Sequence, residues 1–245
     1  GPPNRPPSRS GPSGRPSAPR LPRPDVDIDS ESAEDWPDDD PAYQPAPLHT
    51  EEVVYIGSGS RPNRAYLTAH RASMHQSNKG IVLLTDVYGF QSEETRAAAD
   101  RIAGSCEAHV IVPDLFRGSP WPSSKTPCGA EYESWRISFP LGQLGGEVMG
   151  AAQYLNAAHG VELFGVLGFC FGGGRALELI AGQWVPAHAA AVFYPTRYDV
   201  GAIGAQIDVP LVCIFGGEDH IPGATAQDAE VLRRVLGKNP RMQHQ

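Results

Sequence analysis

The sequence predicts an α/β domain with a mostly parallel β-sheet and helices on both faces. Short apolar segments alternate along the chain with longer segments of helical pattern, which indicates repeated strand–helix units. Most of the short segments are apolar throughout, as expected for strands that are buried on both sides. Proline is concentrated elsewhere, because 13 of the 24 prolines lie in residues 1–47. We therefore divide the chain into a tail, residues 1–47, and one domain, residues 48–245.

The first part of the domain contains an expected strand pair, a buried strand, a helix and a further strand. Residues 57–63 are rich in Gly, Ser, Pro and Asn, so they are expected to join the strand pair through a turn. Ser92 is a suitable N-cap for the helix and Gly104 a suitable end. The strands are expected at residues 52–56, 65–70, 80–85 and 109–112, and the helix at residues 93–104.

The second part of the domain continues the alternation after a stretch rich in Gly, Pro and Ser. That stretch, residues 117–130, is expected to form a long loop. A helix is expected at residues 147–158, a strand at 163–167, a helix that includes 175–181, strands at 189–194 and 211–215, and a helix at 224–236. Ligands of such open sheets bind at the carboxyl ends of the strands, so the loops that follow the strands are where a site is expected.

The tail separates its charges into two blocks. Residues 1–24 hold five arginines and no acid, and residues 25–40 hold nine acids and no base. Few of its side chains can bury apolar surface, so burial cannot offset the entropy lost on ordering. We expect a disordered leader. The alternative is an arm that binds a protein partner, with each block facing charges of opposite sign.

Charge and composition exclude several classes of protein. The net charge of -8 argues against a nucleic-acid-binding protein. No apolar run approaches the roughly 20 residues of a membrane-spanning helix. Four cysteines in 245 residues do not make a disulfide scaffold, so we expect a soluble intracellular protein of the cytoplasm or an organelle matrix, not a secreted one. The histidines lack metal-ligand spacing, and we expect neither a metal nor a cofactor.

One loop carries the pattern of a catalytic nucleophile. Residues 168–174 read Gly-Phe-Cys-Phe-Gly-Gly-Gly between an expected strand and an expected helix, which is a nucleophile elbow with Cys170 in the nucleophile position. Side chains at Gly168 and Gly172 would collide with neighbouring backbone in so sharp a turn. The N–H groups that begin the helix are expected to favour a thiolate and later an oxyanion. The alternative is a buried structural cysteine.

Two further loops supply the groups that such a nucleophile needs. Asp219 follows the expected strand at residues 211–215, the next-to-last strand of the fold, where the acid belongs in the order nucleophile, acid, base, and it would orient an imidazole. A plain turn is the alternative for this segment. The loop after the first buried strand supplies one oxyanion-hole donor, so we assign the backbone N–H groups of Val87 and Phe171 to that role. Asp86 would then lie near the thiol of Cys170.

Together these motifs resemble the dienelactone hydrolase family, also called carboxymethylenebutenolidase-like proteins. The matching segments are residues 86–90, 113–118, 168–174 and 216–220, in the expected order and spacing across residues 50–245. The resemblance implies an α/β-hydrolase fold and a Cys–His–Asp triad that opens lactones or esters through a thioester acyl-enzyme. It also implies that an acid at the Asp86 position helps to deprotonate the cysteine when substrate binds. Arginines bind the anionic substrate in this family, so Arg136 and Arg117 are candidates here, together with Tyr88.

The histidine of the triad is the one part that the motifs do not supply. Only 26 residues follow Asp219, and the expected helix at residues 224–236 uses half of them. We therefore expect the last strand and helix of the fold to be lacking, and the base to lie beyond Gln245. His220 is expected to pack in a turn or to contact solvent, and His244 would lie on the wrong side of the sheet.

Two hypotheses about function follow. In the first, the protein hydrolyses a lactone or carboxylic ester with Cys170 as nucleophile and a small-molecule substrate. In the second, it is a non-catalytic, hydrolase-like subunit of a larger assembly, tethered by residues 1–47. Labelling of Cys170 by an ester would favour the first hypothesis.

Overall fold

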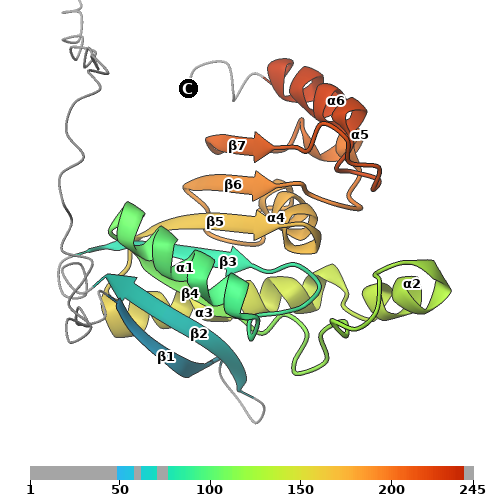
Figure 1. The fold of residues 1–245 in the computed structure, drawn as a ribbon. Helices are drawn as coiled ribbons and strands as arrows, with labels where there is room; N and C mark the ends of the chain where they lie inside the picture. Colours follow the sequence, from blue (N-terminus) through green and yellow to red (C-terminus); the bar gives the residue numbers. More distant parts are fainter. Residues whose placement is uncertain (1–48, 58–61, 71–76, 240–245) are drawn as a thin grey trace, which may run out of the picture. The chain divides into compact units, whose positions relative to one another are not determined.

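Seven strands form one β-sheet in the order β1-β2-β4-β3-β5-β6-β7 (Figure 1). The structure is a computed structural model, and it describes residues 49–57, 62–70 and 77–239. The strands are β1 His49–Ile56, β2 Asn63–His70, β3 Lys79–Leu84, β4 His109–Pro113, β5 Leu163–Phe169, β6 Ala189–Phe193 and β7 Leu211–Ile214. The pairs β1–β2 and β2–β4 are antiparallel, and the remaining pairs are parallel. The predicted mostly parallel α/β sheet is thus confirmed.

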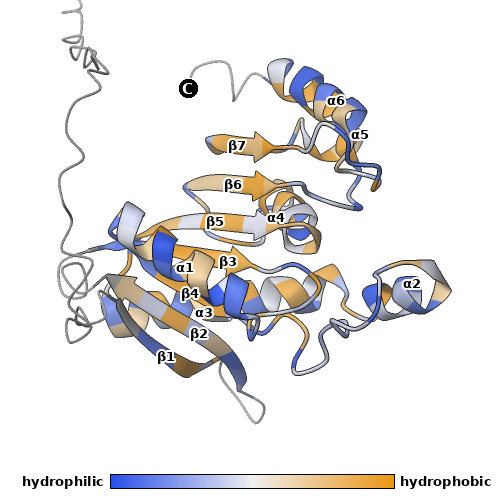
Figure 2. Ribbon diagram, viewed as in Figure 1, coloured by the Kyte–Doolittle hydropathy of each residue, from blue (hydrophilic) through white to orange (hydrophobic). Residues whose placement is uncertain are grey.

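Helices cover both faces of this sheet, as predicted. They are α1 Glu93–Cys106, α2 Gly129–Ile137, α3 Leu141–His159, α4 Phe171–Ala181, α5 Val200–Ile203 and α6 Ala226–Gly237. On one face, Ala99 and Ala103 of α1 pack in a small cluster with β2, β3 and β4. The larger core lies on the other face, under α3, α4 and α6. Figure 2 shows the central strands as the most hydrophobic part of the fold, because residues of both pleats are buried there.

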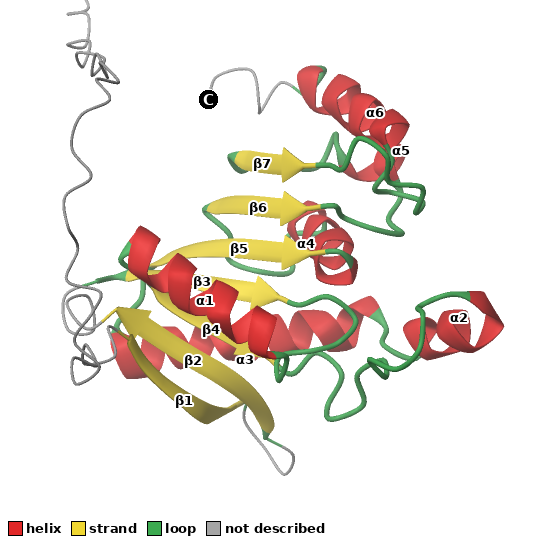
Figure 3. Cartoon of the chain, viewed as in Figure 1, coloured by secondary structure: helices red, strands yellow, loops and turns green. Residues whose placement is uncertain are grey.

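The carboxyl ends of the parallel strands all point to one edge of the sheet. Figure 3 shows that the long loops and α2 gather at this edge, beyond the arrowheads of β3, β5, β6 and β7. This is where open α/β sheets hold their ligands. The loops predicted to carry the site therefore lie on the same side of the molecule.

Three helical boundaries differ from the sequence prediction. The first helix ends at Cys106, because Glu107 takes the left-handed conformation (φ 49°) expected of Gly104. Helix α2 begins inside the predicted loop of residues 117–130. Helix α3 begins at Leu141, well before the predicted residue 147. Glycines in its first turns weaken the helical pattern, and Gly145 is needed for packing: a Cβ there would lie 3.0 Å from the Trp184 ring.

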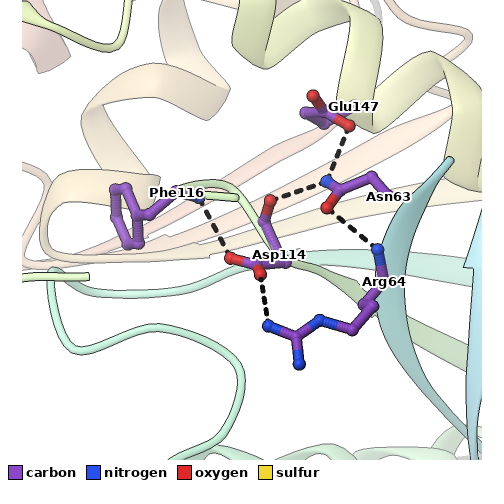
Figure 4. A network of polar contacts seen from close by, with 5 residues as sticks. All are labelled: Asn63, Arg64, Asp114, Phe116 and Glu147. Atoms are coloured by element: carbon purple, nitrogen blue, oxygen red, sulfur yellow. Dashed lines mark hydrogen bonds and ion pairs between the residues drawn. The ribbon is translucent and has the colours of Figure 1, made fainter. Parts of the chain in front are cut away.

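A buried polar network ties α3 to β2 and to the end of β4 (Figure 4). The Asn63 side-chain amide donates to the Glu147 carboxylate and to the Asp114 carbonyl, both at 2.7 Å. The Asp114 carboxylate accepts from the Phe116 backbone N–H at 3.2 Å and from the Arg64 guanidinium at 3.4 Å. Because buried carboxylates need such partners, the network fixes the loop after β4 against the rest of the fold.

The predicted tail, residues 1–47, lies outside the described residues, as does the end of the chain from residue 240. In the part that is described, no helix is long and apolar enough to cross a membrane.

Candidate active site

Cys170 occupies the sharp turn between β5 and α4. Its backbone is strained, with φ 51° and ψ −114°, a combination that L-residues rarely adopt. Three hydrogen bonds hold it there: its N–H donates to the Phe193 carbonyl at 3.0 Å, and its carbonyl accepts from the N–H groups of Thr196 and Gly174, both at 3.1 Å. The turn thus presents the thiol at the carboxyl edge of the sheet.

The glycines around Cys170 allow this turn to form. A Cβ at Gly168 would lie 2.6 Å from the Gly172 carbonyl oxygen. A Cβ at Gly172 would overlap the carbonyl oxygens of Leu84 and Thr85 at the end of β3. The structure therefore shows the backbone collisions that the sequence pattern predicted at both positions.

The thiol of Cys170 is largely buried, and burial raises its pKa. The nearby carboxylates of Asp86 and Asp219 raise the pKa further, whereas the Phe171 N–H and the Thr196 hydroxyl lower it. Thr196 Oγ1 lies 4.0 Å from the sulfur. We expected the N–H groups at the start of α4 to favour the thiolate form of Cys170. The Phe171 N–H does lower the pKa of the thiol, but burial raises this pKa by more. The raised pKa favours the neutral thiol form of Cys170.

Asp86 and Val87 lie in the loop after β3, as the sequence predicted. The Asp86 carboxylate accepts from the Tyr88 backbone N–H at 2.8 Å, and burial raises the pKa of this carboxyl. The Val87 carbonyl accepts from the Trp121 N–H, while the Val87 N–H has no hydrogen-bond partner among the described residues. Phe171 is the first residue of α4, so its N–H is likewise free of intrahelical bonds.

Asp219 lies in the loop after β7, close enough to Cys170 for its charge to raise the pKa of the thiol. Its carboxylate accepts from the Ile221 backbone N–H at 2.8 Å, which is an Asx turn. His220, beside it, is exposed. Across residues 49–57, 62–70 and 77–239, no hydrogen bond joins a histidine to Asp219 or Cys170.

Helix α2 brings two aromatic residues to the site that the sequence prediction missed. Tyr132 is 3% exposed, and its hydroxyl is within electrostatic reach of the Cys170 thiol. The ring of Trp135 lies 6.1 Å from that of Phe171, centroid to centroid. The sequence does contain a helical pattern here, because Tyr132, Trp135 and Phe139 recur at helical spacing. The preceding Gly- and Pro-rich residues 117–130 nevertheless suggested a loop.

The three predicted substrate-binding side chains lie in different places. Arg136 is on α2, paired with Glu133 at 2.8 Å, on the same helix as Tyr132. Arg117 pairs instead with Glu147 at 2.6 Å, so it belongs to the polar network of α3. Tyr88 is partly buried and packs against the main core. Arg136 therefore shares a helix with Tyr132 and Tyr88 shares a loop with Asp86, and both Tyr132 and Asp86 lie near Cys170.

The loop after β6 contributes further residues that no sequence motif indicated. Thr196 contacts the thiol, and Tyr194 lies within electrostatic reach of it. Arg197 pairs with Glu133 of α2 at 2.7 Å. The sequence around these residues gives little indication of their role, because the loop comes close to Cys170 only in the folded sheet. In the described residues, no three His, Cys, Asp or Glu side chains are grouped as metal ligands.

Comparison with known proteins matches this chain to one family. A family model described as the dienelactone hydrolase family matches residues 64–243. A human protein named carboxymethylenebutenolidase homolog is 30% identical over 183 residues, covering 74% of this chain and 71% of its own. The rat protein of the same name is 33% identical over 113 residues, and the match spans 45% of this chain but only 43% of the rat protein.

A solved structure supports the fold. A protein of Klebsiella pneumoniae, described as a dienelactone hydrolase, superposes with a TM-score of 0.64 at 20% identity. The superposition covers 77% of this chain and 80% of the Klebsiella chain. At this identity the likeness concerns the fold alone, and it agrees with the predicted α/β-hydrolase architecture.

Proposed function

Since this chain belongs to the dienelactone hydrolase family, we propose that it hydrolyses a lactone or a carboxylic ester with Cys170 as the nucleophile. The observation that carries the proposal is the strained backbone of Cys170, at φ 51° between β5 and α4. A strained, glycine-flanked turn has a cost in stability, and such strain is concentrated at functional sites. A structural cysteine would need neither the strain nor the glycines.

In the first half of the proposed reaction, the ester acylates the enzyme. A histidine oriented by Asp219 takes the thiol proton, and the Cys170 sulfur forms a bond to the ester carbonyl carbon. The carbonyl electron pair moves to oxygen, where the N–H groups of Val87 and Phe171 stabilise the charge. The tetrahedral intermediate then expels the alkoxide, which takes the proton from the histidine. A thioester on Cys170 remains.

In the second half, water releases the acid. The histidine takes a proton from water, the hydroxide oxygen bonds to the thioester carbonyl carbon, and the carbon–sulfur bond breaks. The sulfur leaves as a thiolate and regains a proton. Asp86 acts at the start of the cycle: its carboxylate, made more basic by burial, accepts a hydrogen bond from the thiol when substrate displaces water, and so assists the transfer of the thiol proton to the histidine.

The aromatic groups near the thiol indicate the substrate that would fit. Tyr132 of α2 is close enough to Cys170 to interact electrostatically with the thiol, and the Trp135 ring lies 6.1 Å from that of Phe171, the residue after the nucleophile; these aromatic neighbours favour a ring or an unsaturated chain in the substrate. Arg136 is the candidate partner for a carboxylate on that substrate.

An activated ester tests this proposal directly. We expect p-nitrophenyl acetate to acylate Cys170, visible as an added acetyl mass on the peptide that contains it. Cys170→Ala is expected to abolish this label, and Cys213→Ala serves as a control because that thiol is also partly buried but lies on β7.

Label at the elbow that survives Cys170→Ala would contradict the proposed nucleophile. A wild-type chain that is not acylated at Cys170 would instead support the non-catalytic alternative. Acylation without release of acetate would show an intact nucleophile that lacks its base, in which case hydrolysis should fall by a factor of about 10^4.

A further inference from the structure

Helix α2 stands beyond the strand ends (Figure 1). Tyr132 packs in the main core and the Trp135 ring lies 6.1 Å from that of Phe171, but the polar contacts of α2 with the rest of the described chain are few. It follows the long loop that begins at Arg117, and Pro140 separates it from α3. Two of its polar side chains bond back to the loop before it: Glu131 pairs with Lys125, and the Trp135 indole N–H donates to the Ser119 carbonyl. These contacts fold the segment on itself but do not attach it to the nucleophile.

One ion pair joins α2 to the opposite side of the site. The Arg197 guanidinium lies 2.7 Å from the Glu133 carboxylate, and it also lies over the Tyr132 ring, 5.5 Å from the centroid. Within the part of the chain that the structure describes, this is the one ion pair or hydrogen bond between α2 and the loops after β6 and β7.

The backbone of Arg197 is fixed from two directions. Its N–H donates to the Pro222 carbonyl at 2.7 Å, in the loop that carries Asp219. Its carbonyl accepts from the Arg175 guanidinium of α4 at 2.5 Å, and its own φ is 56°. The neighbouring Thr196 contacts the Cys170 thiol. The backbone of Arg197 is therefore attached both to α4 and to the loop that carries Asp219. From this fixed backbone, its side chain extends toward α2.

We propose that Arg197 is a positioning residue that holds α2, and with it Tyr132 and Trp135, over Cys170. The pair with Glu133 is partly exposed, with side chains 26% and 39% accessible, so it is weak enough to break and re-form. Breaking it removes the polar link between α2 and the strand-end loops and leaves the packing of Tyr132 in the main core in place. This inference rests on the proposed function only in assigning α2 to the entrance of a substrate site.

Hydrogen exchange of the full chain measures the attachment without any substrate. In Arg197→Met, which keeps the apolar stem over Tyr132 but removes the charge, we expect the amides of residues 129–137 to exchange about two- to fivefold faster. Glu133→Gln removes the same pair from the other side and leaves the fixed backbone of Arg197 untouched. Arg197→Lys should restore most of the protection.

The matched control is Arg233→Met, which removes the exposed Arg233–Glu230 pair of α6. It should leave residues 129–137 unchanged. Unchanged exchange in both Arg197→Met and Glu133→Gln would overturn the proposal, as would an equal increase in the control. An increase spread over β3 and β5 would also overturn it, because that would indicate general destabilisation.

Kinetics separate this inference from the proposed function. With an ester that the wild type hydrolyses, Arg197→Met should raise KM by about two- to fivefold with little change in kcat, because the nucleophile is untouched. A fall in kcat with unchanged KM would contradict positioning. An inactive wild type whose α2 exchange still depends on Arg197 would remove the hydrolase proposal and leave the attachment intact.

Discussion

At the scale of single residues, the protonation state of Cys170 sets how reactive its thiol is. The sulfur is buried and faces two carboxylates, and both effects raise the pKa of the thiol above its ordinary value. Since only the thiolate attacks, alkylation of resting Cys170 should be slow at neutral pH and should keep rising with pH beyond the range of an ordinary cysteine.

The contribution of Asp86 to this state can be measured. Asp86→Asn keeps the oxygen that accepts from Tyr88 but removes a negative charge near the sulfur, so the pKa of the thiol falls. Iodoacetamide should then label Cys170 roughly two- to tenfold faster at pH 8. Glu94→Gln is the control. The charge of Glu94 raises the pKa of Asp86, but Glu94 is not among the groups that shift the pKa of Cys170. Slower labelling in Asp86→Asn would contradict this account.

At the scale of elements, the fold depends on the close approach of α4 to the end of β3. The Gly172 N–H donates to the Thr85 carbonyl at 3.0 Å, and no side chain fits at this contact. Gly172→Ala should lower the free energy of unfolding by about 3 kcal/mol or more, because the helix must move off the strand. The melting temperature should fall by roughly 6–12 °C.

A second helical glycine offers a matched control for this prediction. Gly146 lies exposed in α3, and a Cβ there would meet nothing within 4 Å. Gly146→Ala should therefore stabilise the fold by about 0.5–1 kcal/mol. Equal melting temperatures for the two variants, measured by circular dichroism, would mean that the approach of α4 to β3 is not tight.

The elements also show what a sequence can and cannot reveal. Cys170, its glycines and the strand before it form one local motif, so spacing alone was enough to predict them. Tyr132 and Arg197 were missed, because their relation to Cys170 depends on loops that meet only in the folded sheet. The early start of α3 was missed because its glycines serve a distant partner, Trp184, which no local pattern indicates.

At the scale of the whole molecule, the two ends of the described sheet expose apolar side chains. On β7, Val212 is 57% and Ile214 47% exposed, and on β1, Tyr55 is 64% exposed. Edge strands with exposed apolar residues favour association between chains. We therefore expect the outer strands of the described sheet to be where chains of residues 1–245 associate in concentrated solution.

Replacing the apolar side chains of β7 tests this view. The double variant Val212→Thr with Ile214→Thr keeps β-branched side chains, so the strand itself should persist. We expect the weight-average mass in light scattering to rise less steeply with protein concentration than in the wild type. Ile137→Thr, at an exposed apolar residue of α2, is the control and should behave like the wild type. The same steep rise in all three proteins would exclude the β7 edge as the cause.

The neutral thiol of Cys170 has a consequence for the lifetime of the protein. Peroxides and soft metal ions react with thiolates, and they react far more slowly with a protonated, buried thiol. The exposed thiols of Cys106 and Cys128 meet such reagents first. In the proposed role, Cys170 is charged only during turnover, and between turnovers it stays in a form that oxidants attack slowly. The burial that delays its chemistry thus also preserves it.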